Sequence, residues 1–282
     1  MKSSTHNIFV FALVSLTCGF VGNAVNKLYG PADPMQSLGV LIWLISPLLA
    51  NLLLRALGGD GWADFGIGFK LKSAWRWYLA ALLIPALLSL LPLLLSSLTD
   101  SVDLSGFFAG GLSAFLPLLA ANFTASMVKN IFEEFAWRGY LASRLEHTPA
   151  GTRLKALITG WVWAGWHIPY YLYFLDRSAL QSQTALSMPA LIGLAFLIMP
   201  GQALLYNELR LISGSVWPAW LMHNAANALS FALVTGGSVA VSNRFVHVLL
   251  TPGTEGILYS LLAGLLGWYL HRRRVYLSAD AS

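Results

Sequence analysis

The chain has 282 residues, of which 57% are hydrophobic and only 10% are charged, and its mean hydropathy is +0.65. Soluble domains contain roughly 45 to 50% apolar residues, so this composition does not suit an ordinary soluble domain and predicts an integral membrane protein. The formal charge of +5 comes from 17 Lys and Arg residues that lie mostly between apolar runs. This scattered pattern indicates membrane topology and not nucleic-acid binding.

The first apolar run could be taken for a secretory signal peptide, because Lys2 is followed by an apolar stretch from Ile8 to Phe20. The apolar character continues through Val25 without a clean small-residue cleavage site, so we expect an uncleaved first span. The single cysteine, Cys18, lies in this run. One cysteine excludes a disulfide framework or a cysteine-based metal site within one chain.

Eight apolar runs are bounded by charged residues or by Gly, Pro and Asp, and each is long enough to cross a bilayer. The fourth run has about 39 residues and would reach nearly 60 Å as a helix, about twice the hydrocarbon thickness. We expect Gly110, Gly111 and Pro117 to break it or to displace its start. The predicted fold is all-α, a polytopic transmembrane bundle of about eight spans. The expected spans are 8–26, 38–56, 77–98, 107–145, 156–175, 188–208, 216–238 and 253–270.

The basic residues between the runs predict the orientation, because Lys and Arg accumulate on the cytoplasmic side of a membrane. With eight spans both termini share a side, and twelve basic residues fall on that side against three on the other. Both termini are therefore predicted to be cytoplasmic. The larger set is Lys2, Arg55, Lys70, Lys72, Arg76, Arg144, Arg153, Lys155, Arg210, Arg272, Arg273 and Arg274, and the smaller is Lys27, Arg177 and Arg244.

Polar and ionisable residues inside the expected spans are the candidates for chemistry. An ionisable side chain there costs roughly 2.5 to 3.5 kcal/mol on insertion, so such residues are rare and are functional candidates by default. The candidates are Lys129, Glu133, Glu134 and Arg138 in the fourth run, His167 in the fifth, and His223, Asn224 and Asn227 in the seventh.

The two adjacent glutamates permit two interpretations. Residues four apart share a helix face, so Glu134 can pair with Arg138 while Glu133 is turned about 100° away toward a cavity, where it could act as a base. Alternatively, Lys129 pairs with Glu133 just as Arg138 pairs with Glu134, which gives two structural ion pairs. The spacing alone does not separate these alternatives.

The histidines have structural alternatives as well. A lone His167 in an apolar span is more often a hydrogen-bonded packing residue than a catalyst, and Trp163, four residues earlier, can cover the same face. His223 and Asn227 project the same way from the seventh run, whereas Asn224 points elsewhere. Such a His and Asn pair can also serve to hold two helices together by hydrogen bonds.

Common depth connects four of these residues. A rise of about 1.5 Å per residue places Glu133, His167, His223 and Asn227 at a similar level in the inner half of the bilayer. A carboxylate, two imidazoles and a carboxamide suit amide hydrolysis: Glu133 would take a proton from water, oriented by His167, while His223 and Asn227 would donate to the oxyanion.

These residues also resemble a known family. The segment from Glu133 to Arg138, Glu-Glu-Phe-Ala-Trp-Arg, resembles the EExxxR motif of the CAAX protease and bacteriocin-processing (CPBP) family, which includes the type II CAAX prenyl endopeptidases. A histidine motif at Trp163 to His167 and the segment His223 to Asn227 follow in the family's order, over roughly Val128 to Leu229. The departure is Trp163, where the family usually has phenylalanine.

The resemblance implies an intramembrane endopeptidase and a role for each matching residue. Its substrate would be a peptide or membrane-anchored protein, CAAX-like or not, met in the lipid bilayer, with no nucleic acid involved. In a bacterium the protein would be expected in the plasma (inner) membrane. The implied roles are Glu133 as catalytic glutamate, His167 as its partner, His223 and Asn227 as oxyanion hole, and Glu134, Arg138 and Trp163 in support.

Two questions stay open at this level. The family has also been described as metalloproteases, and two His and one Glu could ligate zinc. The HExxH helix is absent, and an Asn suits an oxyanion donor better than a zinc ligand, so metal-free glutamate chemistry is favoured. A non-proteolytic bacteriocin-immunity or partner-binding protein is one alternative function, and a proton-coupled transporter is another.

The chain is predicted to have three parts. They are helices without motif at 1–100, a catalytic core at 101–240, and a last span with a basic tail at 241–282.

Overall fold

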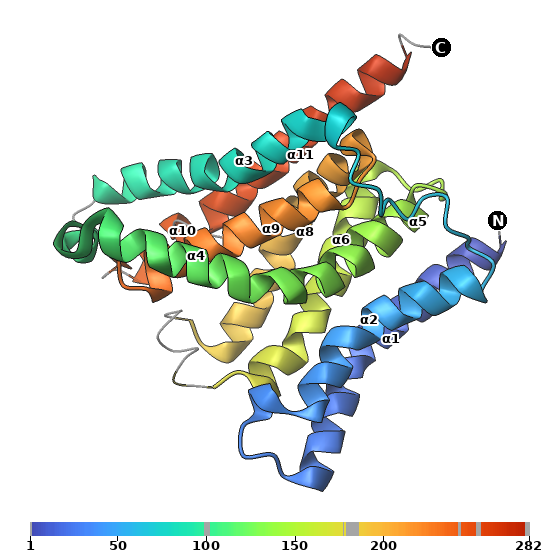
Figure 1. Ribbon diagram of the computed structural model, residues 1–282, viewed down its shortest axis with the longest axis horizontal. Helices are drawn as coiled ribbons and strands as arrows, with labels where there is room; N and C mark the ends of the chain where they lie inside the picture. The colour runs from blue at the N-terminus through green and yellow to red at the C-terminus, as the bar shows by residue number, and fades with distance from the viewer. Residues whose placement is uncertain are drawn as a thin grey trace.

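The computed structural model describes residues 2–98, 102–176, 178, 186–241, 244–251 and 255–279. These residues form a bundle of helices (Figure 1) and confirm the predicted all-α class. The exception is a pair of two-residue strands, β1 (Val102–Asp103) and β2 (Ala240–Val241), which are antiparallel and tie the start of the fourth helix to the segment after the seventh.

The first two helices, α1 (Lys2–Tyr29) and α2 (Leu38–Ala56), form a closely packed pair joined through the short helix η1 (Pro34–Gln36). A Cβ added at Gly22 would lie 2.3 Å from the carbonyl oxygen of Gly39, so the two backbones touch at these glycines. The Asn26 Oδ1 atom accepts a hydrogen bond of 2.9 Å from the Gly39 amide. Small residues that let backbones approach are typical of helix pairs in membranes.

Two further helices, α3 (Leu71–Ser97) and α4 (Ser105–Ala136), come next in the chain. The expected break in the fourth run is present at Gly111, whose φ of 59° and ψ of −164° interrupt the helix. Beyond α4 the chain winds through a π-helical turn, η2 (Trp137–Ala142), into the one-turn helix α5 (Ser143–Leu145). Such π-helical turns inside α-helices are frequent at functional sites.

The rest of the bundle packs around α8. Its helices approach closely at glycines: a Cβ at Gly160 would lie 2.5 Å from the Pro200 backbone, and one at Gly267 would lie 2.6 Å from the Leu205 nitrogen. The elements are α6 (Thr152–Pro169) with η3 (Tyr170–Phe174), α8 (Met188–Ser213), α9 (Trp217–Ser230) with η4 (Phe231–Thr235), α10 (Arg244–Leu250) and α11 (Ile257–Ala279).

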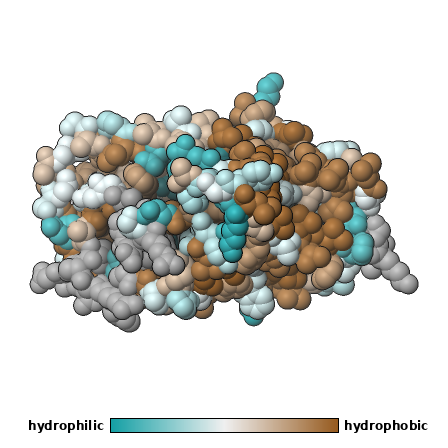
Figure 2. Space-filling model, turned by 90° about the horizontal axis from the view of Figure 1, so that it is seen from below, coloured by the Kyte–Doolittle hydropathy of each residue, from teal (hydrophilic) through white to brown (hydrophobic). Residues whose placement is uncertain are grey.

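Five stretches of the described residues are long and apolar enough to cross a membrane, which supports an integral membrane protein. The helices α6, α9 and α11 occupy most of the other three predicted runs. The start of α1 and the end of α11 lie toward the same side of the molecule (Figure 1). Hydrophobic side chains cover much of the face in Figure 2. Leu87 is 63% exposed and Leu265 is 67% exposed, as expected for side chains that face lipid. The five stretches are Thr5–Tyr29, Leu38–Ala56, Leu71–Ser97, Ser105–Leu145 and Met188–Ser213.

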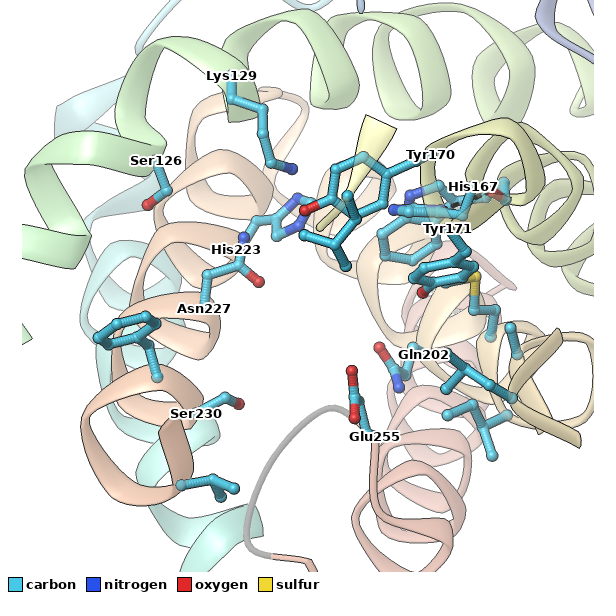
Figure 3. Close-up of a pocket in the computed structure, with 18 of the residues that line it drawn as sticks. Ser126, Lys129, His167, Tyr170, Tyr171, Gln202, His223, Asn227, Ser230 and Glu255 are labelled. Carbon is cyan, nitrogen blue, oxygen red and sulfur yellow. Dashed lines mark hydrogen bonds between the residues drawn. The ribbon is translucent and has the colours of Figure 1, made fainter. Parts of the chain in front are cut away.

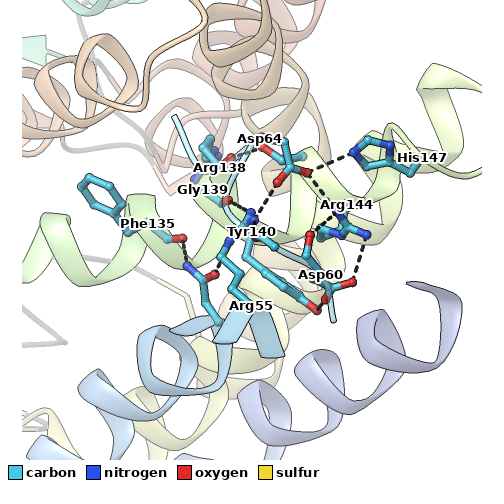
Figure 4. A network of polar contacts seen from close by, with 12 residues as sticks. Arg55, Asp60, Asp64, Phe135, Arg138, Gly139, Tyr140, Arg144 and His147 are labelled. Atoms are coloured by element: carbon cyan, nitrogen blue, oxygen red, sulfur yellow. Dashed lines mark hydrogen bonds and ion pairs between the residues drawn. The ribbon is translucent and has the colours of Figure 1, made fainter. Parts of the chain in front are cut away.

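The connection between α2 and α3 is folded onto the bundle through a polar network around Arg55 (Figure 4). The buried Arg55 guanidinium donates to Asp64 Oδ1 and to the Gly139 carbonyl, each at 2.6 Å, while Arg144 pairs with Asp60 at 2.9 Å. Burial opposes ionisation of Asp64, but the hydrogen bond and charge of Arg55, with the charge of Arg144, hold its pKa below its usual value. The network therefore fixes η2, the turn that follows the two glutamates.

Candidate active site

Four of the predicted residues meet at one cavity of about 580 Å³ between α4, α6, α8 and α9 (Figure 3). Trp163 and His167 reach it from α6, and His223 and Asn227 reach it from α9. Lys129 lines the same cavity from α4. Figure 3 shows His167 and His223 on opposite walls, so a molecule bound between them could contact both imidazoles.

Glu133 lies behind the cavity wall, with its side chain 1% exposed. Lys129 forms an ion pair with its Oε1 atom, and the Trp163 indole Nε1 donates to its Oε2 atom at 2.9 Å. Both carboxylate oxygens are therefore held by donors, and Glu133 is not among the residues that line the cavity. In its contacts the structure has the second arrangement considered above, two ion pairs between residues four apart.

Glu134 lies next to Glu133 and connects two other polar side chains. Its Oε1 atom accepts from Arg138 Nη1 at 2.9 Å and from His223 Nδ1 at 2.8 Å. A carboxylate only accepts hydrogen bonds, so Nδ1 of His223 carries the hydrogen, and Nε2 is the nitrogen left for the cavity. The predicted pair of Glu134 with Arg138 is confirmed, and the bond to His223 is an addition that the sequence did not indicate.

His167 is oriented in a similar way by its own helix. Its Nδ1 atom donates to the carbonyl oxygen of Trp163 at 2.9 Å, which again leaves Nε2 as the free ring nitrogen. The imidazole stacks on Tyr171, with ring centroids 5.8 Å apart. One residue earlier, Trp166 exchanges hydrogen bonds with Trp43 of α2, of 2.8 and 3.1 Å, and these fix this part of α6 against the first helix pair.

Trp163 contacts several other residues of the site. Besides its bond to Glu133, its ring lies edge-on to His223 at a centroid distance of 5.6 Å. The Arg138 guanidinium lies 4.4 Å from its centroid and 4.5 Å from that of Tyr206. Arg138 is fully buried, so these two rings provide much of its surroundings.

Asn227 belongs to a ladder of amides between α4 and α9. Its Nδ2 atom donates to Asn130 Oδ1 at 3.4 Å, and Asn130 in turn donates to Asn224 Oδ1 at 3.1 Å. Asn224 also accepts from Ser126 Oγ at 3.0 Å. Asn224 thus points away from the cavity, as expected, and joins the two helices. Asn130 was missed, although its place four residues before Glu134 on the same helix was a signal for it.

The side chains around the cavity can be compared with the ligands that a zinc ion needs. Among the described residues, no three His, Cys, Asp or Glu side chains are grouped so that they could hold a metal ion. Both oxygens of Glu133 already accept hydrogen bonds from Lys129 and Trp163. A zinc site with two His, one Glu and a water needs a free carboxylate oxygen at about 2 Å from the metal.

A helical membrane bundle with two carboxylates behind a cavity, and two imidazoles and a carboxamide on its walls, has the features of an intramembrane hydrolase. Comparison with known families agrees: residues 113–229 match the family described as Type II CAAX prenyl endopeptidase Rce1-like. This part of the chain holds all three motifs and is similar to that family of CAAX-type proteases. No curated protein matches the chain.

Proposed function

We propose that the protein is an endopeptidase that hydrolyses a peptide bond of a membrane-associated substrate in this cavity. The observation that carries the proposal is the pair of imidazoles, His167 and His223, which line one cavity while Glu133 lies directly behind it. Each imidazole has its Nδ1 fixed by a partner and its Nε2 free. The family match at residues 113–229 supports a peptide as substrate.

Glu133 is the proposed general base. Lys129 and Trp163 hold its two carboxylate oxygens, and the Lys129 side chain is 39% exposed, so it can swing off Oε1 as water enters. Glu133 then takes a proton from this water, and the resulting hydroxide attacks the carbonyl carbon of the peptide bond. His167, with Nε2 free, accepts a hydrogen bond from the same water and orients it. The proton returns to the leaving amine when the tetrahedral intermediate collapses.

His223 and Asn227 are the proposed oxyanion hole. His223 can donate from Nε2 only when the ring is protonated, because Nδ1–H is already given to Glu134. Glu134 holds the His223 ring through Nδ1, and its second partner, Arg138, fixes the carboxylate in place. Loss of one oxyanion donor typically raises a barrier by about 2.7 to 4 kcal/mol.

The test is peptide cleavage by the purified protein. We expect Glu133→Gln and His223→Ala to lower the rate roughly 100-fold or more, since each removes a group acting in the transition state. Glu146→Gln is the matched control, because Glu146 pairs with Lys155 at 3.0 Å outside the site. Cleavage by the two site variants at the wild-type rate would show that the catalytic assignment is wrong.

The zinc-dependent form of the same protease is tested by metal analysis of pure, active protein. The glutamate mechanism predicts activity without stoichiometric zinc and no loss on chelation. Stoichiometric zinc that leaves together with activity would replace it with a metal mechanism.

A non-proteolytic role in bacteriocin immunity or partner binding is the second candidate. The observation that favours it is that Lys129 and Trp163 hold both carboxylate oxygens of Glu133, as they would if the ion pair had a purely structural role. This role predicts that the Glu133→Gln variant still protects cells against the bacteriocin. The protease predicts that protection, where it depends on cleavage, is lost in the same variant.

We also propose eight membrane crossings with both termini in the cytoplasm, and the plasma membrane as location in a bacterium. The support is that described helices occupy most of each of the eight predicted runs, together with the twelve-to-three distribution of basic residues. Reporter domains fused to either end test the orientation. Reporters that are active only outside the cytoplasm should stay silent at both termini.

A further inference from the structure

A second acidic group, Glu255, lies in the cavity but outside the family match. It precedes α11, whereas the match ends at residue 229. Among the described residues that line the cavity, Glu255 is the acidic one. Figure 3 shows its carboxylate directed into the cavity beside Gln202, on the side away from Lys129 and the two histidines.

Glu255 has no visible partner within the part of the chain that the structure describes. No described side chain donates a hydrogen bond to it or forms an ion pair with it. The cation of the cavity, Lys129, is engaged by Glu133. A carboxylate at such a place is costly unless a cation meets it, and ionisable groups of this kind usually mark a substrate path.

The surroundings of Glu255 suit a long cationic side chain. Leu191, Leu194 and Ile198 of α8 line the same cavity with apolar atoms, which can cover an aliphatic stem. Gln202 is fixed beside Glu255, because its Nε2 atom donates to Ser260 Oγ at 2.8 Å. A guanidinium or ammonium group at the end of such a stem would reach the Glu255 carboxylate, which lies just before α11.

We propose that Glu255 binds the side chain of a lysine or arginine in the peptide substrate. This contact would fix the register of the peptide, so that a bond some residues away lies between His167 and His223. The inference rests on the proposed function, since it assigns the substrate class of that same cavity. It predicts a preference for substrates with one basic residue at a fixed distance from the cleaved bond.

The test measures binding separately from cleavage, in the Glu133→Gln background. Short apolar fluorescent peptides are compared in matched pairs, in which each position in turn carries arginine or its neutral isostere citrulline. We expect one position at which arginine binds more tightly by on the order of tenfold to a hundredfold, the range for hydrogen bonds to charged groups. Adding Glu255→Gln should bring that ratio close to one, whereas adding the control Glu146→Gln should leave it unchanged.

A charge-reversal variant keeps the inference testable if Glu255→Gln alone is poorly folded. Glu255→Lys should prefer glutamate to glutamine at the same peptide position. Equal binding of arginine and citrulline peptides at every position would overturn the inference, and so would a preference that persists in Glu255→Gln. Cleavage by the protein with wild-type Glu133 is measured on the same peptides. Binding without cleavage would contradict the proposed function alone, and cleavage without an arginine preference would contradict the role of Glu255 alone.

Discussion

Replacing Trp163 by phenylalanine separates the two things that this side chain does. The variant keeps an aromatic ring, the residue that the related family usually has here, and removes the indole N–H that donates to Glu133 Oε2 at 2.9 Å. A hydrogen bond to a buried charged group contributes about 1.5 to 3 kcal/mol. The smaller ring also weakens the contact with Arg138, which is worth about 0.5 to 2 kcal/mol.

We therefore expect Trp163→Phe to be destabilised by about 2 to 4 kcal/mol, which lowers the unfolding midpoint in detergent by on the order of 5 to 10 °C. If the bond also aims Glu133 at the attacking water, kcat falls roughly 10- to 100-fold while KM changes little, because substrate contacts are unaltered. Peptide cleavage and thermal unfolding of the same preparation give both numbers.

The matched control is Trp161→Phe, two residues earlier on α6. Trp161 also donates its indole N–H, in its case to the Phe196 carbonyl at 3.2 Å, but it is about half exposed and is not among the residues that line the cavity. We expect its activity within about twofold of wild type, since exposed hydrogen bonds contribute little. The reasoning is refuted if Trp163→Phe matches Trp161→Phe in both rate and midpoint.

Three further perturbations test the packing and the charges. Lys129→Met should lower stability by about 1 to 3 kcal/mol in detergent unfolding, because Glu133 then keeps a single donor; an unchanged midpoint would show that the ion pair is not formed. Asp64→Asn should lower the free energy of unfolding at neutral pH, and the difference from wild type should shrink as the pH falls below about 4. The reason is that a carboxyl with a lowered pKa stabilises the fold only while it is ionised. A difference that does not depend on pH would contradict the contact with Arg55. Gly160→Leu should abolish folding, seen as loss of monodisperse protein, because even a Cβ meets the α8 backbone at 2.5 Å.

Local patterns in the sequence predicted what lies within single helices. The spacing of four residues gave the ion pair of Glu134 with Arg138 and the common face of His223 and Asn227, and all of these are present. The two glycines of the long fourth run also indicated its break, which the structure has at Gly111. Such features depend on residues close in the chain, so helix geometry alone determines them.

The sequence patterns did not predict the hydrogen bonds between helices. The bonds from Trp163 to Glu133 and from His223 to Glu134 join residues 30 and 89 positions apart in the chain. They depend on how each helix is rotated, which packing decides and periodicity leaves open. Glu255 was missed for another reason: it stands near the edge of the last apolar run, where a charged residue is ordinary.

The hydrogen bonds from α2 to the motif helices show that the part of the chain without motifs holds the motif helices in place. Trp43 holds α6 beside His167, Asn51 donates to the Phe135 carbonyl at 2.8 Å, and Arg55 donates to that of Gly139. All three come from the stretch that carries no motif and lies outside the family match. A shortened chain of residues 113–229 would keep every motif side chain and lose the anchors of two of its helices. A segment used for grafting or for expression must therefore include α2, together with α1, which packs closely against it.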